Sequence, residues 1–360
     1  MLFLNGRMIN YLRLLLLPFS AIYGIVVLIR NKLYDIGIFK QTSFDLPVIC
    51  VGNLVVGGSG KSPVTEYLIN LLADKRIAVL SRGYGRETRG YILADQHATA
   101  TTIGDEPMQF YNKFPDITVA VCEDRVRGIN ILKQQHDVII LDDAFQHRSV
   151  RPGLSILLFE FQKLLKPQFL LPAGNLRESF SGYHRAQLLL VTKGPSEISD
   201  GQRSVCADKF DPASRSKLSF SHLTYHDLVH LMLSEKRSCN SISDTTSVFL
   251  LTGIANPLPL MAHLRQYTQM IYHHSYPDHH QFTIKDISVL VKSFQKNPSP
   301  DKIIITTEKD AQRLLNNTLK ELLLNLPVYY LPVKIAITEE DRTTFDNKIL
   351  DYVSSTTRNR

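Results

Sequence analysis

Short runs of apolar residues alternate with longer amphipathic segments from about residue 46 onward. The runs at 48–51, 138–141 and 188–191 each hold four apolar residues in a row. Continuous apolar strands that alternate with helices are typical of a parallel sheet covered by helices on both faces. We therefore predict an α/β fold of that kind. The same pattern predicts further strands at 78–80, 118–121 and 156–159 and a helix at 124–132.

A second alternating pattern begins near residue 248 and predicts a smaller C-terminal α/β domain, with strands at 248–251, 303–305 and 328–331. The stretch between the two patterns is more polar and rich in Ser and Asp, which favours a connecting region. We therefore divide the chain into an N-terminal helical segment (1–45), a core (46–200), a connecting region (201–246), a C-terminal domain (247–353) and a loose tail (354–360).

Residues 52–63, Gly-Asn-Leu-Val-Val-Gly-Gly-Ser-Gly-Lys-Ser-Pro, follow the first predicted strand and indicate a phosphate-binding loop. The glycines allow successive N–H groups to point at phosphate oxygens. Lys61 can reach the β- and γ-phosphates of ATP, and the Ser62 hydroxyl can ligate Mg²⁺. The loop has Val55 where the usual pattern has Gly, and the alternative is a Gly-rich turn with a chance lysine. The predicted nucleotide-binding residues are Val55, Val56, Gly57, Gly58, Ser59, Gly60, Lys61 and Ser62.

Two carboxylates, Asp142 and Asp143, follow the predicted strand 138–141. An acidic residue at the carboxyl end of such a strand can hold Mg²⁺ beside a phosphate loop, although it could also be a capping residue. We predict that Asp142 is a metal ligand and that Asp143 has a supporting catalytic role. Gln146 and His147 follow closely, so we expect both near the site.

A base for proton transfer could come from either of two segments. Gly104-Asp105-Glu106-Pro107 forms a predicted tight turn before a helix at 108–110, and Asp105 could cap that helix or accept the proton of an attacking hydroxyl. In Asp278-His279-His280, a histidine could be oriented by a carboxylate. A zinc cluster with the nearby His273 and His274 lacks further evident ligands.

Basic residues matter because phosphoryl transfer gathers negative charge. Candidates are Arg82 and Arg86 around a Gly-Tyr-Gly loop, Arg125 and Arg127 at a helix start, and Arg177 in a Gly-containing loop. The net charge of +7, from 41 basic and 34 acidic residues, suits phosphorylated substrates or anionic lipid. No block of consecutive Lys or Arg indicates a nucleic-acid partner, and four scattered cysteines fit a reduced cytosolic setting.

The N-terminal segment from Leu14 to Ile29 carries no charge. A helix of that length rises about 24 Å, short of the roughly 30 Å hydrocarbon core, and Pro18 and Gly24 would bend it. A cleaved signal peptide would separate the phosphate loop from cytosolic ATP. We favour a helix that dips into or lies on an anionic membrane surface over a full span or a buried core helix. Its basic flanks are Arg7, Arg13, Arg30 and Lys32.

These segments, in this order, resemble the tetraacyldisaccharide 4′-kinase family, the lipid A 4′-kinases, over about residues 46–335. The family shares the non-glycine residue at the position of Val55. This chain departs from the family's usual pattern at Ala144, Asn175 and Ser179, which affects loop stiffness more than chemistry. The matching segments are 52–63, 81–86, 104–107, 142–147, 171–178, 252–257, 277–280 and 306–310.

The resemblance implies that the γ-phosphate of ATP is transferred to the 4′-hydroxyl of a lipid-linked tetraacyl glucosamine disaccharide 1-phosphate. It implies a dyad of Asp105 and His279, which domain closure could assemble. It also implies that Lys61 stabilises the transferring phosphoryl group and that Ser62 and Asp142 hold Mg²⁺. The residues expected to contact substrate or phosphate are Arg82, Arg125, Gln146, His147 and Arg177.

An acylated substrate would place the enzyme at the cytoplasmic face of the bacterial inner membrane, with no obligate protein partner. Two other functions stay open. One is a peripheral membrane ATPase switch that resembles the septum-site and partition ATPases, which would need no hydroxyl base. The other is a soluble small-molecule kinase whose N-terminal helix is merely buried.

Overall fold

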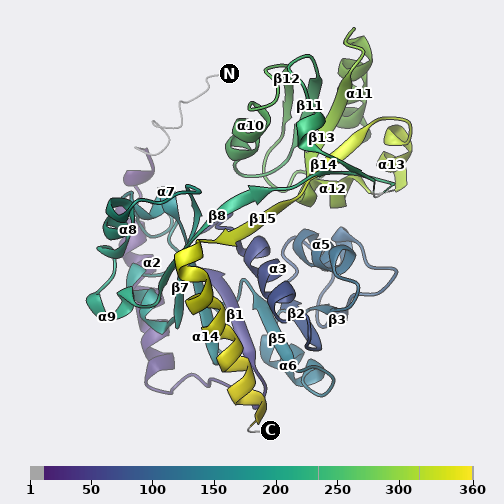
Figure 1. Ribbon diagram of the computed structural model, residues 1–360. Helices are drawn as coiled ribbons and strands as arrows, with labels where there is room; N and C mark the ends of the chain where they lie inside the picture. The colour runs from purple at the N-terminus through teal and green to yellow at the C-terminus, as the bar shows by residue number, and fades with distance from the viewer. Residues whose placement is uncertain (1–11, 234, 316, 359–360) are drawn as a thin grey trace.

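The computed structural model describes residues 12–233, 235–315 and 317–358. These residues form two sheets, each with helices packed against it (Figure 1). We call the nine-stranded sheet with its helices the first lobe, and the six-stranded sheet with its helices the second lobe. This mixed α/β architecture with a large, mostly parallel sheet confirms the predicted fold class.

The strands of the first lobe lie in the order β15-β8-β7-β6-β1-β5-β2-β4-β3. Neighbours pair in parallel except β15 with β8 and β3 with β4. Strands β2 to β5 lie on one side of β1, and β6 to β8 lie on its other side, so the strand order reverses at β1. A crevice at the carboxyl ends of strands at such a point is the usual ligand site. The bounds are β1 Val48–Asn53, β2 Ile77–Ser81, β3 Ile92–Leu93, β4 Thr118–Val121, β5 Val138–Asp142, β6 Leu154–Glu160, β7 Leu188–Gly194, β8 Leu218–Tyr225 and β15 Val333–Ile337.

Helices cover both faces of this sheet, and each face has its own apolar cluster. One cluster includes side chains of α3, α5 and α14, and the other includes side chains of α6, α7 and α8. The central strands β1 and β5 are buried throughout because apolar residues cover both sides. The helix bounds are α2 Leu17–Asp35, α3 Lys61–Leu71, α4 Ala100–Ile103, α5 Asp105–Lys113, α6 Arg125–Leu132, α7 Phe161–Leu164, η1 Phe180–Arg185, α8 Asp200–Ala207, α9 Pro212–Arg215 and α14 Glu339–Arg358.

The second lobe has the strand order β10-β9-β14-β13-β11-β12 and two apolar clusters of its own. Its strands are β9 Leu228–His230, β10 Lys236–Arg237, β11 Ser247–Thr252, β12 Ile271–Ser275, β13 Lys302–Thr307 and β14 Val328–Leu331. Its helices are η2 Cys239–Ser241, α10 Leu258–Leu264, α11 Ile284–Lys296, α12 Glu308–Leu314 and α13 Asn317–Leu323.

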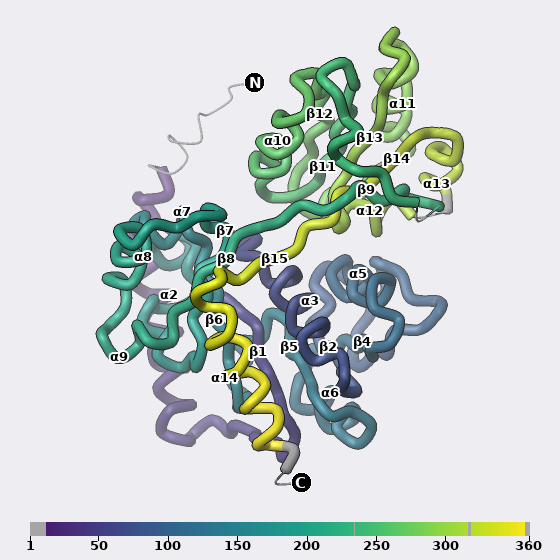
Figure 2. Tube along the Cα trace, in the orientation of Figure 1, coloured from purple at the N-terminus to yellow at the C-terminus, as the bar shows by residue number. Residues whose placement is uncertain are grey.

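Two antiparallel strands connect the lobes: β8 leads out of the first lobe, and β15 returns to it (Figures 1 and 2). The chain therefore ends in the first lobe, where α14 packs on the sheet. The predicted C-terminal domain of 247–353 thus runs too far, because β15 and α14 lie with the first sheet. The prediction of a loose tail at 354–360 is wrong as far as Arg358, since α14 continues to that residue; residues 359–360 lie outside the described residues.

The packing of α14 can be tested with Phe345, which is fully buried among first-lobe side chains and meets the ring of Tyr67 edge to face. Phe345→Ala is expected to lower the free energy of unfolding by about 3–5 kcal/mol, because the cavity adds to the lost burial. Leu350→Ala, on the exposed side of the same helix, should cost only about 0.5 kcal/mol. Chemical denaturation measures both; equal small losses would contradict a packed α14.

The N-terminal helix α2 begins one residue before Pro18, which suits a first turn. It lies along the loop after α7, where Ser20 Oγ donates to Leu170 O (3.0 Å) and Tyr23 OH donates to Arg177 O (2.7 Å). Much of its apolar surface remains exposed. Among the described residues, no helix has the length and apolar character needed to cross a membrane. The predicted flanking residue Arg7 lies outside the described residues.

Candidate active site

The segment between β1 and α3 forms an open, glycine-dependent loop. Gly57 and Gly60 have φ values of 102° and 87°, which side chains with a Cβ rarely adopt. Gly60 immediately precedes Lys61, the first residue of α3, so that the helix N-terminus faces the loop. Val55 forms an isolated antiparallel bridge with Leu176. An extended residue with such a bridge needs no glycine, which explains the departure from the usual pattern.

Hydrogen bonds from residues at the ends of β1 and β7 hold this loop in place. The Asn53 amide donates to Ser59 Oγ (2.7 Å), and the Thr192 hydroxyl donates to Ser59 O (2.7 Å). Lys193, directly after Thr192, donates from Nζ to Gly58 O. Asn53 and Ser59 are fully buried, so the loop is held before any phosphate enters. The sequence analysis missed Thr192 and Lys193, whose only signal was the apolar strand that precedes them.

Asp142 ends β5 directly beside β1, where it is the register partner of Val51. It is buried, and its Oδ1 lies 3.4 Å from the hydroxyl of Thr65, one turn after Ser62 on α3. Burial, and then the charge of Asp143, raise the pKa of Asp142 to about 7 although Lys61 opposes this shift. A divalent cation would stabilise the ionised form. Oxygen donors from Ser62 and Asp142 therefore fit Mg²⁺.

Asp143 has a different environment from its neighbour. Its carboxylate lies 3.6 Å from Lys61 Nζ and accepts from Arg177 Nη2 at 2.8 Å. Burial opposes ionisation, but the charges of Lys61 and Arg177 lower the pKa of Asp143 below its ordinary value. Arg177 also donates to Asn53 Oδ1. Asp143 thus joins two predicted phosphate-binding cations at the mouth of the loop.

A group of cations lies close to the two aspartates. Arg125, the first residue of α6, is 3% exposed, and its Nε has no hydrogen-bond partner among the described residues. Burial and the charge of Arg82 lower the pKa of Arg125. Burial and the charge of Arg125 lower the pKa of His147 to about 4. An anion that binds here would neutralise the buried charge of Arg125 and accept a hydrogen bond from its unpaired Nε.

Other sequence candidates have supporting positions. Arg86 pairs with Glu123 at 2.5 Å and shapes its own loop, while Arg127 is exposed. Gln146 donates to Asn53 O (2.8 Å) and Glu178 Oε1 (2.9 Å), so it ties two loops at the base of the site. Gln146 therefore links the segment that begins the phosphate loop to the loop that carries Glu178.

Asp105 and His279 meet across the two lobes. His279 Nδ1 lies 3.1 Å from Asp105 Oδ2, although the two residues are 174 positions apart in the chain. Asp105 is the first residue of α5 and follows the N-cap Gly104, so the helix predicted at 108–110 begins earlier than expected. The exposed ring of Tyr84 lies against His279, with the ring centroids 5.5 Å apart. The structure thus brings the two residues of the predicted dyad together.

At this point the two lobes contact each other through α5 of the first lobe and α12 of the second (Figure 2). Hydrogen bonds and ion pairs across it join Asp105 with Arg313, Glu106 with Lys309, Asn112 with Gln312 and Lys113 with Glu308. The sequence analysis missed Arg313. Its only signal was the adjacent family segment 306–310, and an arginine on a short amphipathic helix ordinarily suggests a solvated face.

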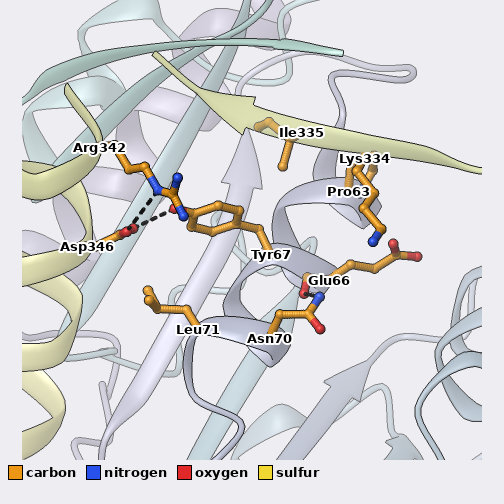
Figure 3. A pocket seen from close by; sticks show the side chains of 9 residues that line it. All are labelled: Pro63, Glu66, Tyr67, Asn70, Leu71, Lys334, Ile335, Arg342 and Asp346. Carbon is orange, nitrogen blue, oxygen red and sulfur yellow. Dashed lines mark hydrogen bonds and ion pairs between the residues drawn. The ribbon is translucent and has the colours of Figure 1, made fainter. Parts of the chain in front are cut away.

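A separate cavity of about 430 Å³ lies between α3, β15 and α14 (Figure 3). Tyr67, Lys334 and Arg342 are among its lining residues, and the Tyr67 hydroxyl donates to Asp346 at 2.7 Å. None of the predicted site residues lines it. This cavity therefore lies outside the candidate site, which is at the carboxyl ends of β1 and β5.

Comparison with known proteins points to one family. The profile of the tetraacyldisaccharide-1-P 4′-kinases matches residues 12–354. A tetraacyldisaccharide 4′-kinase of Bacteroides thetaiotaomicron is 44% identical over 96% of this chain and 94% of its own length. One from Flavobacterium johnsoniae is 43% identical over 96% and 98%. A crystal structure of LpxK from Aquifex aeolicus, described as an "apo" form in complex with ATP, is 28% identical with a TM-score of 0.73, covering 95% of this chain and 99% of that one.

Proposed function

This chain belongs to the tetraacyldisaccharide-1-P 4′-kinase family, and we propose that it uses ATP to phosphorylate the 4′-hydroxyl of a tetraacyl disaccharide 1-phosphate in lipid A biosynthesis. The observation that carries the mechanism is the contact between Asp105 and His279 where the two lobes meet. Glu106, next to Asp105, is close enough for its charge to act on Asp142. A kinase that uses a hydroxyl acceptor needs a proton acceptor near the γ-phosphate, whereas an ATPase switch does not.

The phosphate loop and its neighbours would bind the nucleotide. The N–H groups of residues 55–62 would surround the phosphates, and Lys61 would stabilise negative charge on the transferring phosphoryl group. Mg²⁺ held by Ser62 and Asp142 would neutralise phosphate charge when bound. Asp143, through its contacts with Lys61 and Arg177, would keep both cations directed at the phosphates.

His279 is the better proton acceptor of the dyad. Asp105 Oδ2 already receives hydrogen bonds from Arg313 and faces His279 Nδ1. Burial opposes ionisation of Asp105, but hydrogen bonds from His279 and Arg313 lower its pKa to about 2, so it is a weak base. Asp105 would therefore orient the imidazole, and His279 would take the proton of the 4′-hydroxyl through Nε2.

Two arginines and a neutral histidine around the aspartates would bind the anionic groups of the two substrates. The Nε of Arg125 has no hydrogen-bond partner among the described residues. Arg82 lies close enough for its charge to lower the pKa of Arg125, and Arg125 lies close enough to lower the pKa of His147. We propose that Arg82, Arg125 and His147 contact phosphate, while Arg177 contacts it together with Asp143. Gln146 would act by keeping this part of the site rigid.

The acylated acceptor remains in a lipid layer, and α2 offers the apolar surface that would meet it. Phe19, Ile22, Ile25 and Leu28 are each at least half exposed on α2. Apolar side chains that enter the interface, with basic residues near anionic head groups, favour membrane association. We propose that α2 docks on the cytoplasmic face of the inner membrane, where ATP is present, without an obligate protein partner.

This docking predicts that Ile22→Asp/Ile25→Asp weakens binding to vesicles of phosphatidylethanolamine and phosphatidylglycerol by about 10²–10⁴-fold, since each isoleucine that enters the lipid contributes roughly 1.5–3 kcal/mol. Both side chains are exposed, so folding should be unaffected. Val289→Asp, at a half-exposed position on α11 of the second lobe, is the matched control. Flotation assays measure the partition; unchanged binding of the double variant would contradict docking through α2.

The proposed reaction is tested with γ-labelled ATP and a tetraacyl disaccharide 1-phosphate in mixed micelles. The label should appear in the lipid, and little inorganic phosphate should form without acceptor. ATP turnover at full rate without acceptor would favour an ATPase switch. Full activity on a water-soluble sugar, with no preference for the lipid, would favour a soluble small-molecule kinase.

A further inference from the structure

The Asp105–His279 dyad has a third participant, Arg313 on α12. The Arg313 side chain is 1% exposed. It donates to Asp105 Oδ2 from Nε (3.1 Å) and Nη2 (2.6 Å), and Nη2 lies 3.4 Å from His279 Nδ1. A buried guanidinium that donates twice to one carboxylate fixes both its position and its charge.

Arg313 is itself fixed within the second lobe. Its Nη1 donates to Asp310 Oδ1 (2.8 Å) and to Gly253 O (3.1 Å). Asp310 is fully buried and accepts from the Gly253 N–H (3.0 Å) and the Thr307 hydroxyl (2.8 Å). The same Gly253 carbonyl accepts from the backbone N–H of His279 (3.1 Å). Arg313 and His279 therefore both donate to the carbonyl of Gly253, and both contact Asp105.

We propose that Arg313 is a positioning residue of the phosphoryl transfer: it holds the Asp105 carboxylate ionised, with Oδ2 directed at His279 Nδ1, when the second lobe meets the first. This inference rests on the proposed function, because the dyad is part of it. With Asp105 fixed as an anion, the Nδ1 proton of His279 stays on the side of Asp105. Nε2, which lies 3.1 Å from Lys309 Nζ, is then the nitrogen that would accept the hydroxyl proton.

The alternative is that Arg313 only holds the lobes together. Three other polar contacts on the same interface could serve that purpose, and one of them lies away from the dyad: Asn112 Nδ2 donates to Gln312 Oε1 at 2.6 Å. Gln312 is on the same helix as Arg313 and does not contact Asp105 or His279 in the described contacts. Gln312→Ala is therefore a matched control for loss of an interface contact.

The two roles differ in their effect on pH dependence. The dyad is faced by Arg313, Lys309 and Asp310 from α12, by Glu106 from α5, by Asp278 from its own loop and by Tyr84 from the loop after β2. Removing Arg313 removes a charge and two hydrogen bonds that lower the pKa of Asp105, so the carboxylate is protonated at higher pH. The acid limb of the kcat profile, where protonation of the Asp105–His279 dyad lowers kcat, must then move to higher pH.

The test measures kcat against pH at saturating ATP and lipid acceptor for the full chain and for Arg313→Gln, Arg313→Lys and Gln312→Ala. For Arg313→Gln we expect kcat at neutral pH to fall by about 10–100-fold and the acid limb to rise by about 1–2 pH units. Arg313→Lys keeps the charge, so its acid limb should stay near that of the wild type. Gln312→Ala should keep the wild-type profile, with kcat within about twofold.

A second measurement decides the matter even when Arg313→Gln does not fold. If Arg313 acts through Asp105, Arg313→Lys lowers kcat in the wild type but has little further effect in an Asp105→Asn background. An equal loss in both backgrounds would overturn the inference, as would an Arg313→Gln acid limb that does not move. Failure of the wild type to phosphorylate the lipid would instead refute the proposed function, so the two failures are distinguishable.

Discussion

Replacing His279 with Ala is expected to lower kcat by about 10²–10⁴-fold, the usual contribution of a positioned acid–base group. The reason is the geometry at the lobe contact, where His279 Nδ1 is 3.1 Å from Asp105 and its ring is partly open to the site. Asp105→Ala should cause a loss in the same range, because the imidazole loses its orientation. The affinity for ATP should change little in either variant, since the phosphate loop is formed by other residues.

Rapid-quench phosphoryl transfer and equilibrium nucleotide binding measure these two effects separately. His274→Gln is a suitable control, because His274 lies on β12, just before the loop that carries His279. Wild-type turnover in His279→Ala would remove the dyad from the mechanism. A large loss of ATP affinity in the same variant would mean that the second lobe binds nucleotide rather than the acceptor proton.

Lys61→Met is expected to lower kcat by about 10²–10³-fold, the range found when one donor to a developing negative charge is removed. Lys61 begins α3 and lies 3.6 Å from Asp143, at the mouth of the loop. Without it, the transferring phosphoryl group loses its closest flexible cation. Lys61→Arg should recover only part of the activity, because a planar guanidinium does not reproduce a compact ammonium group.

The matched control for Lys61 is Lys75→Met, which removes a partly exposed lysine beyond the other end of α3. That variant should keep wild-type kcat, so that a general change in net charge is excluded. Isothermal titration with a non-hydrolysable ATP analogue should show weaker binding for Lys61→Met only. Unchanged kcat for Lys61→Met at saturating ATP would contradict the proposed role of the loop.

Local sequence patterns predicted the parts of the site that one strand and its next turn determine. The strand at 48–51, the loop at 52–63 and the strand ending in Asp142 are all continuous segments, so pattern and chemistry coincide. The extended bridge of Val55 with Leu176 was not predictable in the same way, because it depends on a loop far along the chain.

Long-range pairing explains the parts that the sequence pattern did not reveal. The residues of β8 and β15 pair across a gap of more than one hundred residues, and nothing in either segment specifies the partner. For that reason the predicted C-terminal domain of 247–353 includes β15 and α14, which the structure places with the first lobe. Arg313 contacts Asp105 across 208 positions, so that an arginine at the first-lobe contact resembles any surface cation when the sequence is considered alone.

The most direct test of the central claim is a double-mutant cycle between Asp105 and His279 in single-turnover phosphoryl transfer. If the two side chains act as one unit across the lobes, Asp105→Ala/His279→Ala should be about as slow as the slower single variant, because residues that act together are not additive. If the losses multiply instead, the two residues act independently, and a dyad assembled by the meeting of the lobes is contradicted.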